Sequence, residues 1–342
     1  MKHIIVGGSG FVGRHLAADL VGRGAEVVVA DIERSDLPHY AKATFIAADV
    51  TDAAAVQRLP ILADDMVYNL SARMLSPIMP RRQRHDFFWP VNYHGTENIL
   101  AAMAGKGAHR LVHFTTDMIY GPAQTVPQRE DHPKQPLGEY GASKLRSEEL
   151  CRTWRQRGMA ISIFRPRLII GPGRLGILAR LFRLIDLGLP IPMIGSGRNP
   201  YQFISVYDCA SAARLGFEAG VPNGEYNLGS DDPPPVRELL RALIRRAGSR
   251  SVPLPTPAPL VKAVLGALDL VNLPLMDPEQ YLIADEMCIL DTRRAKTELG
   301  WWPAFTDTDM LIAAYDDYAA KRHPSTGRGI AAARIESRGA RR

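Results

Sequence analysis

Cysteine is scarce in this sequence, and patterns that bind metal ions are missing. The three cysteines lie far apart and in no CxxC spacing, which argues against a disulfide framework or a zinc knuckle: Cys151, Cys209 and Cys288. The nine histidines form no HExxH or similar ligand set. We therefore expect neither structural disulfides nor a metal site.

Long apolar runs are also absent. The most apolar long stretch, Leu260–Leu275, contains Lys262 and Asp269 and is too short and too polar to cross a bilayer. Strand-forming residues begin at position 3, which leaves no room for a signal peptide. We expect a cytoplasmic protein without a membrane span.

Basic charge is confined to one end of the chain. The formal net charge is +6, and residues 321–342 hold seven Lys or Arg against one Glu, so the rest of the chain is about neutral. This tail is rich in Gly, Ser, Ala and Arg without an apolar period, which predicts a disordered end. A solvated tail is favoured over a tail that binds an anionic partner, and the charge gives no reason to expect nucleic acid.

The stretch Lys2–Gly13 carries the first sharp signal. The run His3–Val6 predicts a buried strand, and a helical pattern over residues 14–23 follows the glycines. Glycines at 7, 10 and 13 allow a tight turn, a close approach of backbone N–H groups to a pyrophosphate, and close packing of helix on strand. The positive N-terminal end of the helix favours the same anion. The sequence therefore predicts a dinucleotide site.

The identity of the dinucleotide depends on Asp31, which ends the next predicted strand. Its carboxylate can accept hydrogen bonds from the ribose hydroxyls of the adenosine and would repel a 2′-phosphate. NAD is therefore favoured over NADP, although Arg34 nearby keeps NADP open.

Apolar runs alternate with helical patterns through the first third of the chain. Five strands are predicted, over His3–Val6, Ala25–Ala30, Ala43–Ala48, Asp65–Leu70 and Arg110–Thr115. This alternation predicts an α/β fold with a parallel sheet wound on both sides. Ligands bind beyond the carboxyl ends of such strands, where these side chains and glycines fall: Gly7, Asp31, Asp49, Ser71 and Thr116.

A second sharp signal is the pair Tyr140 and Lys144 in YGASK. Residues 140–150 predict a helix, so the two side chains lie one turn apart on one face. A phenol with a pKa near 10 is a poor base at neutral pH, but a nearby ammonium and a positive nicotinamide ring would stabilise the phenolate. The alternative is a surface tyrosine and a solvated lysine. Downstream of a dinucleotide half-domain, we favour general acid–base chemistry.

From residue 2 to about residue 318 the chain resembles an extended short-chain dehydrogenase/reductase of the NAD-dependent epimerase/dehydratase type. The resemblance rests on GGSGFVG (7–13), DV (49–50), NLSA (69–72), VNYHGTENIL (91–100), TTDMIYG (115–121), YGASK (140–144), FRPRLIIGPG (164–173) and LGWWP (299–303). It implies a Rossmann-type domain over residues 1–174, to which about 202–220 return. A smaller C-terminal α/β lobe over 175–318 would bind the substrate.

The resemblance also implies roles for individual residues. Thr116 would hydrogen-bond the reacting oxygen, Tyr140 would be the acid/base, and Lys144 would tune it and hold the nicotinamide ribose. The remaining residues implied to contact NAD are Gly7, Gly10, Phe11, Val12, Gly13, Asp31, Asp49, Val50, Leu70, Ser71, Ala72, Asn92, Pro166 and Leu168. A homodimer through the helices containing Asn92–Gly105 and Tyr140–Leu150 is implied as well.

Two departures from the family pattern concern the substrate. Dehydratases carry Thr-Asp-Glu after the fifth strand, whereas this chain has Thr116-Asp117-Met118, and a thioether cannot transfer a proton. Many sugar-nucleotide members place an arginine before a Phe-Ile pair to hold the diphosphate. Here Tyr201 stands there and Arg198 lies three residues earlier. We count Asp117, Met118, Arg198 and Tyr201 as substrate candidates, and we disfavour a dehydratase reaction.

Other segments offer weaker patterns. We expect Arg73–Pro90 to be irregular, with an aromatic cluster at 87–89 that lines a cleft, forms a dimer face or packs in the core. Pro253–Pro259 reads as a linker, and Arg174, Arg180 and Arg183 as solvated helix positions.

Three functions remain open. The favoured one is a nucleotide-sugar epimerase-type reaction by hydride transfer at a carbinol carbon. The second is a net dehydrogenase of the 3β-hydroxysteroid dehydrogenase branch, acting on a steroid- or isoprenoid-type alcohol. The third is a non-catalytic NAD-binding sensor, against which the intact Thr116, Tyr140 and Lys144 argue.

Overall fold

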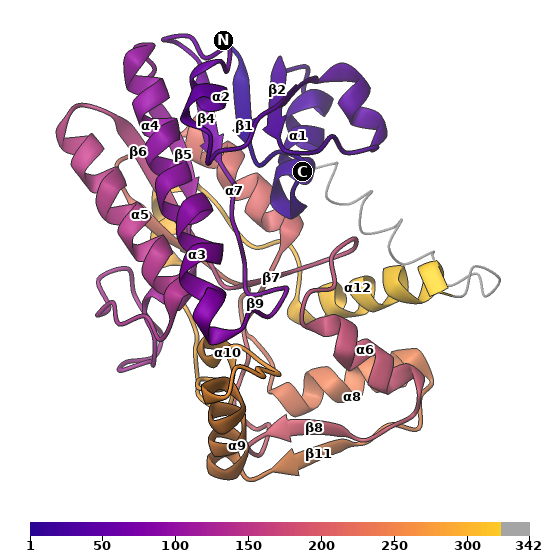
Figure 1. Cartoon of the computed structure of the whole chain (residues 1–342). Helices are drawn as coiled ribbons and strands as arrows, with labels where there is room; N and C mark the ends of the chain where they lie inside the picture. The colour runs from indigo at the N-terminus through magenta and orange to yellow at the C-terminus, as the bar shows by residue number, and fades with distance from the viewer. Residues whose placement is uncertain (323–342) are drawn as a thin grey trace.

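The protein is built around one parallel β-sheet. A computed structural model describes residues 1–322, and the basic tail predicted from residue 321 lies outside them from residue 323 onward. The sheet has seven parallel strands in the order β10-β6-β5-β4-β1-β2-β3 (Figure 1). Their bounds are β1 His3–Val6, β2 Val27–Asp31, β3 Thr44–Ala47, β4 Met66–Asn69, β5 Arg110–Phe114, β6 Ala160–Pro166 and β10 Glu225–Leu228. The predicted doubly wound α/β fold is confirmed.

Two strands of this sheet were not predicted. Both contain a fully buried polar residue, Arg165 in β6 and Asn227 in β10, which interrupts the apolar run expected of a buried strand. Arg165 is neutralised by Glu148 and Asn227 is hydrogen-bonded, so the sheet tolerates them.

Helices cover both faces of the sheet. On one face α1 (Phe11–Gly22) and α7 (Val206–Glu218) pack against Ile5, Val27 and Val29. On the other face α2 (Ala53–Gln57), α4 (Gly95–Gly105) and α5 (Glu139–Gln156) pack against alternate residues of the same strands. This alternation is the period of two that a sheet buried on both sides requires.

The strand order reverses between β1 and β4. In the register, His3 pairs with Val27 on one side and with Met66 on the other, so the carboxyl ends of these three strands are level. The loops after them therefore meet at one edge, where doubly wound sheets bind their ligands.

The segment Arg73–Pro90 is more regular than its sequence suggests. Residues Arg81–Gln83 form a 3-10 turn and Arg84–Trp89 form α3, which continues through a π turn over Pro90–His94 into α4. The prediction of an irregular segment was therefore wrong for residues 81–89. The wider π turn accommodates a residue without an N–H donor.

The second lobe is made of shorter pieces. It contains α6 (Leu178–Asp186), β8 (Ile191–Ile194), α8 (Val236–Ala247), β11 (Pro253–Thr256), α9 (Ala258–Leu270) and α10 (Pro278–Tyr281). A two-stranded pair, β7 (Leu168–Ile170) with β9 (Phe203–Ser205), lies between this lobe and the large sheet (Figure 1). Two further helices follow, α11 (Arg293–Leu299) and α12 (Asp307–Arg322). The domain boundary at residue 174 stays a prediction.

The predicted linker Pro253–Pro259 was wrong except at Pro257, because α9 already begins at Ala258 and the first four residues form a strand. This strand is β11, which pairs in parallel with β8. The pair has only two strands, so each is an edge where the missing N–H of a proline is tolerated.

Candidate active site

One pocket runs along the carboxyl edge of the sheet, and thirteen of the predicted cofactor residues line it. It also includes Phe114, Thr115, Ile169 and Arg174. The predicted residues that line it are Gly7, Gly10, Phe11, Val12, Asp31, Asp49, Val50, Leu70, Ser71, Ala72, Tyr140, Lys144 and Pro166. We call it the cofactor pocket. The role of each residue in it stays a prediction.

Three predicted cofactor residues do not line this pocket. Gly13 lies under the loop, where a Cβ atom would stand 2.3 Å from the carbonyl oxygen of Gly7. Asn92 is buried, and its side-chain amide holds the backbone of Arg73. Its oxygen accepts from the backbone nitrogen of Arg73 at 2.9 Å, and its nitrogen donates to the backbone oxygen of Arg73 at 3.1 Å. Leu168 lines the neighbouring pocket instead. Gly13 and Asn92 thus shape the pocket from behind its surface.

The first loop fits a dinucleotide pyrophosphate. Gly7 has a φ of +79°, and a Cβ atom there would stand 2.6 Å from the backbone nitrogen of Ser71. Gly10 precedes α1, and within the described residues no side chain caps that helix. Its first N–H groups are therefore left for an anion. The loop combines the close backbone approach and the positive helix end that a pyrophosphate needs.

Asp31 stands at the end of β2 as predicted. Its carboxylate oxygens accept hydrogen bonds from the backbone nitrogens of Ser9, at 2.9 Å, and Ile32, at 2.8 Å. Burial raises the pKa of this carboxyl. Each carboxylate oxygen has further lone pairs, so Asp31 can also accept from ribose hydroxyls.

A second pocket adjoins the first, and Tyr140 belongs to both. We call it the substrate pocket; it is lined by Thr115, Thr116, Asp117, Met118 and apolar side chains from residues 74–75 and 166–178. The residues shared by the two pockets are Met74, Thr115, Tyr140, Pro166, Ile169 and Arg174. The phenol therefore lies at the junction of the two pockets.

Tyr140 is almost fully buried. Its ring packs on the buried ring of Phe88 with a centroid distance of 5.6 Å, so this member of the aromatic cluster packs in the core behind Tyr140 and lines neither pocket. Burial raises the pKa of the Tyr140 phenol, while its hydrogen bond with Thr116 and the charge of Arg174 lower it. The sequence had pointed to Lys144 as the cation that assists the phenol. The structure adds Arg174 to that role.

Lys144 lies one turn further along α5 and is also buried. Its ammonium donates to the backbone oxygen of Phe114 at 3.1 Å and to that of Ser71 at 3.5 Å. Burial lowers the pKa of this ammonium to about 8. The side chain is thus held at the ends of two strands that border the cofactor pocket.

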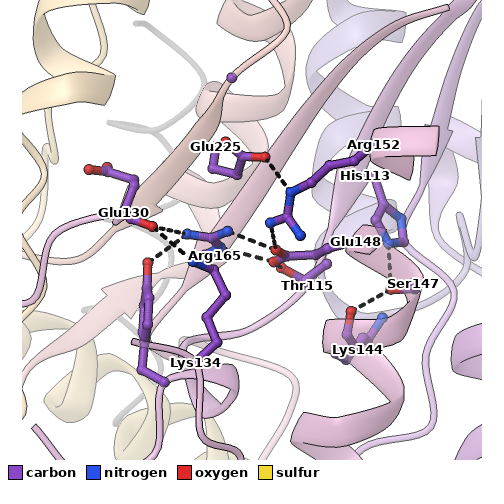
Figure 2. Close-up of polar contacts among 12 residues, drawn as sticks. His113, Thr115, Glu130, Lys134, Lys144, Ser147, Glu148, Arg152, Arg165 and Glu225 are labelled. Carbon is purple, nitrogen blue, oxygen red and sulfur yellow. Dashed lines mark hydrogen bonds and ion pairs between the residues drawn. The ribbon is translucent and has the colours of Figure 1, made fainter. Parts of the chain in front are cut away.

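A buried polar network fixes α5 on the sheet (Figure 2). Glu148 accepts from Thr115 at 2.8 Å and from two nitrogens of Arg165 at 2.9 and 2.7 Å. Ser147 donates to the backbone oxygen of Lys144 at 2.7 Å, and His113 contacts Ser147. Thr115 precedes Thr116 and Arg165 precedes Pro166, and both of these neighbours line the site. The carboxylate of Glu148 therefore holds three parts of the site together, namely α5, the end of β5 and the end of β6.

The substrate candidates fall into two groups. Asp117 and Met118 line the substrate pocket, and Asp117 forms a buried ion pair with Arg167. Tyr201 is stacked beneath Arg167, with 4.9 Å from the guanidinium carbon to the ring centroid. Arg198 is exposed and lines none of the described pockets, so the structure does not bring it to the site.

Arg174 was expected to be solvated, and that expectation was wrong. It precedes α6 and lines both pockets. Its guanidinium lies 3.0 Å from the sulfur of Met74 and 6.0 Å from the centroid of the Phe11 ring. Burial lowers its pKa. Arg180 and Arg183, on α6, are exposed as expected.

Glu279 is a second residue that the sequence did not reveal. It comes from α10 in the second lobe, is buried, and accepts hydrogen bonds from the backbone nitrogens of Tyr140 and Gly141 at 2.9 Å each. Burial, together with the charge of Asp277, raises the pKa of this carboxyl to about 8. Glu279 thus caps the N-terminus of the helix that carries Tyr140, a function that no local pattern could indicate because 139 positions separate the partners.

Within residues 1–322, every helix is too short or too polar to span a bilayer. In the same residues, no group of three or more His, Cys, Asp or Glu side chains is arranged to hold a metal ion.

Comparisons with known proteins agree with this geometry. The model of the NAD-dependent epimerase/dehydratase family matches residues 3–229. The uncharacterized protein y4nG of Sinorhizobium fredii is 31% identical, covering 95% of this chain and 80% of its own length. The 2-alkyl-3-oxoalkanoate reductase of Stenotrophomonas maltophilia is 28% identical, covering 74% of this chain and 77% of its own length. The solved structure of MoeE5 in complex with UDP-glucose and NAD superposes with a TM-score of 0.74 at 23% identity, covering 95% of this chain and 100% of that one.

Proposed function

The chain belongs to the NAD-dependent epimerase/dehydratase family of extended short-chain dehydrogenases/reductases, and on that premise we propose that it epimerises a nucleotide sugar by redox chemistry at a carbinol carbon. As a member of this family it is an enzyme, and its cofactor is NAD. The observation that carries the proposal is the position of Tyr140, which lines the cofactor pocket and the substrate pocket together.

In this proposal the side chains of the site handle the proton. Tyr140 accepts the proton of the substrate hydroxyl as the carbinol becomes a carbonyl, and Thr116 orients the reacting oxygen through its hydroxyl. Arg174 supplies positive charge that lowers the pKa of the phenol. We propose that the ammonium of Lys144, one turn further along α5, acts in the same direction. NAD, when bound, accepts the hydride from the carbon and can return it.

The same groups serve the reverse step. If the carbonyl intermediate presents its other face before reduction, Tyr140 returns the proton to the oxygen and the carbon gains the opposite configuration. No cofactor is consumed in such a cycle. The loop from Gly7 to Gly13, the carboxylate of Asp31 and the ammonium of Lys144 would hold the dinucleotide.

A nucleotide-sugar substrate is supported by the similarity to MoeE5, whose solved complex contains UDP-glucose. One observation favours a second candidate, a net dehydrogenase of an apolar alcohol. More than half of the side chains that line the substrate pocket are apolar. In the sequence, Tyr201 stands where many sugar-nucleotide members have an arginine, although it does not itself line this pocket. The related 2-alkyl-3-oxoalkanoate reductase is named for a substrate with an alkyl chain.

Absorbance of NADH separates the two candidates. Purified enzyme is incubated with UDP-, GDP- and dTDP-sugars and, separately, with steroid and isoprenoid alcohols, with and without added NAD. The proposal expects an epimerised sugar without lasting NADH and without added NAD. Stoichiometric NADH that accumulates only with an alcohol and added NAD would replace the epimerase with the dehydrogenase.

We also propose that the enzyme is a cytoplasmic homodimer that pairs through α4 and α5. These helices lie side by side on one face of the sheet (Figure 1). Light scattering of the full chain tests the dimer, and a monomer at micromolar concentration would contradict it.

A further inference from the structure

The helix α9 and the loop after it expose an apolar surface. Of the thirteen residues of α9, only Ala258 and Asp269 are buried. Between positions 260 and 275 six large apolar side chains are 51–66% exposed, namely Leu260, Val264, Leu270, Val271, Leu273 and Leu275. We call these six residues the α9 surface. A concentration of large exposed apolar side chains on one element and the loop after it indicates an interaction site.

Both charged residues of this helix are turned away from water. The ammonium of Lys262 donates to the backbone oxygen of Leu282 at 2.6 Å and pairs with Asp285 at 2.5 Å. Asp269 is buried in an ion pair with Arg84 of α3. The outer side of α9 therefore carries no charge.

Cations border the surface. The backbone nitrogen of Arg82 donates to the side chain of Asn272 at 3.4 Å, and the guanidinium of Arg180 donates to the backbone oxygen of Leu275 at 2.7 Å. Arg81, Arg82 and Arg180 are exposed, and none has a carboxylate within ion-pair distance among residues 1–322. An apolar surface with an arginine border is complementary to an anionic lipid bilayer.

This surface adjoins the substrate pocket. Arg180 belongs to α6, whose start contributes Ile177 and Leu178 to the pocket wall. Gln280, five residues after Leu275, lines the same pocket from α10. Figure 1 shows α9 at the end of the second lobe, away from the large sheet.

We propose that the α9 surface docks this enzyme peripherally on anionic membrane, with the α6–α10 wall of the substrate pocket close to the lipid. A helix of thirteen residues is too short to span a bilayer but long enough to lie in its interface. A second copy fits less well, because a two-fold contact through this face would bring the same unpaired arginines together.

Vesicle flotation of the full chain tests the proposal. The wild type is expected to float with phosphatidylcholine vesicles containing phosphatidylglycerol, and less with phosphatidylcholine alone. Leu260→Glu combined with Val264→Glu is expected to lower the partition coefficient by at least about tenfold, since each large side chain loses its burial in lipid. The matched control, Leu62→Glu with Val126→Glu, changes exposed apolar residues elsewhere and leaves flotation unchanged. NAD binding verifies the folding of every variant.

A third variant tests the arginine border. Arg81→Gln, Arg82→Gln and Arg180→Gln together are expected to remove the preference for anionic vesicles. Flotation that the α9 double variant leaves intact would overturn the proposal and assign vesicle binding to another part of the chain. A wild type that binds no vesicles, but forms an oligomer that the double variant dissociates, would make the α9 surface a protomer interface instead.

Discussion

The two pockets that meet at Tyr140 are built in different ways. The cofactor pocket is formed mainly by short loops after consecutive strands, and its glycines and Asp31 lie within one stretch of about 30 residues. The substrate pocket combines loop 74–76, the turn after β5, residues 166–178 and Gln280 from a distant helix. Local backbone geometry determines the first pocket, whereas tertiary packing determines the second. Mutations in the cofactor pocket should therefore act through local backbone geometry, and mutations in the substrate pocket through the contacts and charges that tertiary packing brings together.

The largest effect is expected where both pockets share one support, the Glu148–Arg165 ion pair. Both side chains are fully buried. Glu148→Gln leaves a buried guanidinium without its counter-charge and is expected to lower the free energy of unfolding by about 3–5 kcal/mol. Glu149→Gln is the control, because its pair with Arg146 is exposed and its loss should change stability by less than about 0.5 kcal/mol. Urea denaturation of both variants checks the difference, and equal losses would refute it.

The cofactor pocket should be sensitive to a single added methyl group. Gly13→Ala places a Cβ atom 2.3 Å from the carbonyl oxygen of Gly7 and must displace the loop. We expect the Kd for NAD to rise about tenfold or more, because small misplacements in a binding loop have large effects. Gly22→Ala in the same helix meets nothing within 4 Å and should leave NAD binding unchanged. Calorimetric titration with NAD measures both, and an unchanged Kd for Gly13→Ala would mean that the loop does not bind the dinucleotide.

The substrate pocket should respond through charge instead. Arg174 lowers the pKa of Tyr140, so Arg174→Gln should raise that pKa and move the ascending limb of the pH–rate profile for carbinol oxidation, where the phenol loses its proton, to higher pH by up to about one pH unit. Arg180→Gln, on the exposed side of α6, serves as the control and should not move it. If both variants gave the wild-type profile, Arg174 would have no part in tuning the phenol.

The sequence was sufficient for the first pocket and not for the second, and particular residues show why. Gly7, Gly10 and Asp31 could be placed because strand, turn and helix follow one another directly. Arg174 follows Gly173 in a segment whose burial depends on contacts with Phe11 and Met74, 163 and 100 positions away. Arg165 interrupted an apolar pattern and concealed a central strand, although its partner Glu148 makes it an element of the core.

The last effect depends on pH and concerns the link between the lobes. The pKa of Glu279 is raised in the folded state to about 8 from an ordinary value of 4.5. Its contribution to stability is therefore fully present below about pH 4.5 and is lost as the pH rises through about 8. Glu279→Gln removes this dependence, so the stability of the variant relative to wild type should increase between these pH values. Urea denaturation at several pH values measures it, and a constant difference would show that Glu279 does not titrate in this range.

The most direct test of the account is the comparison of Tyr140→Phe with wild type, once the absorbance assay has identified a substrate. Because the phenol is assigned the proton and the glycine loop the dinucleotide, kcat should fall by roughly 10²–10⁴ while the Kd for NAD stays within about twofold. Full turnover by Tyr140→Phe with an unchanged Kd would contradict the assignment of Tyr140 as the acid–base group between the two pockets.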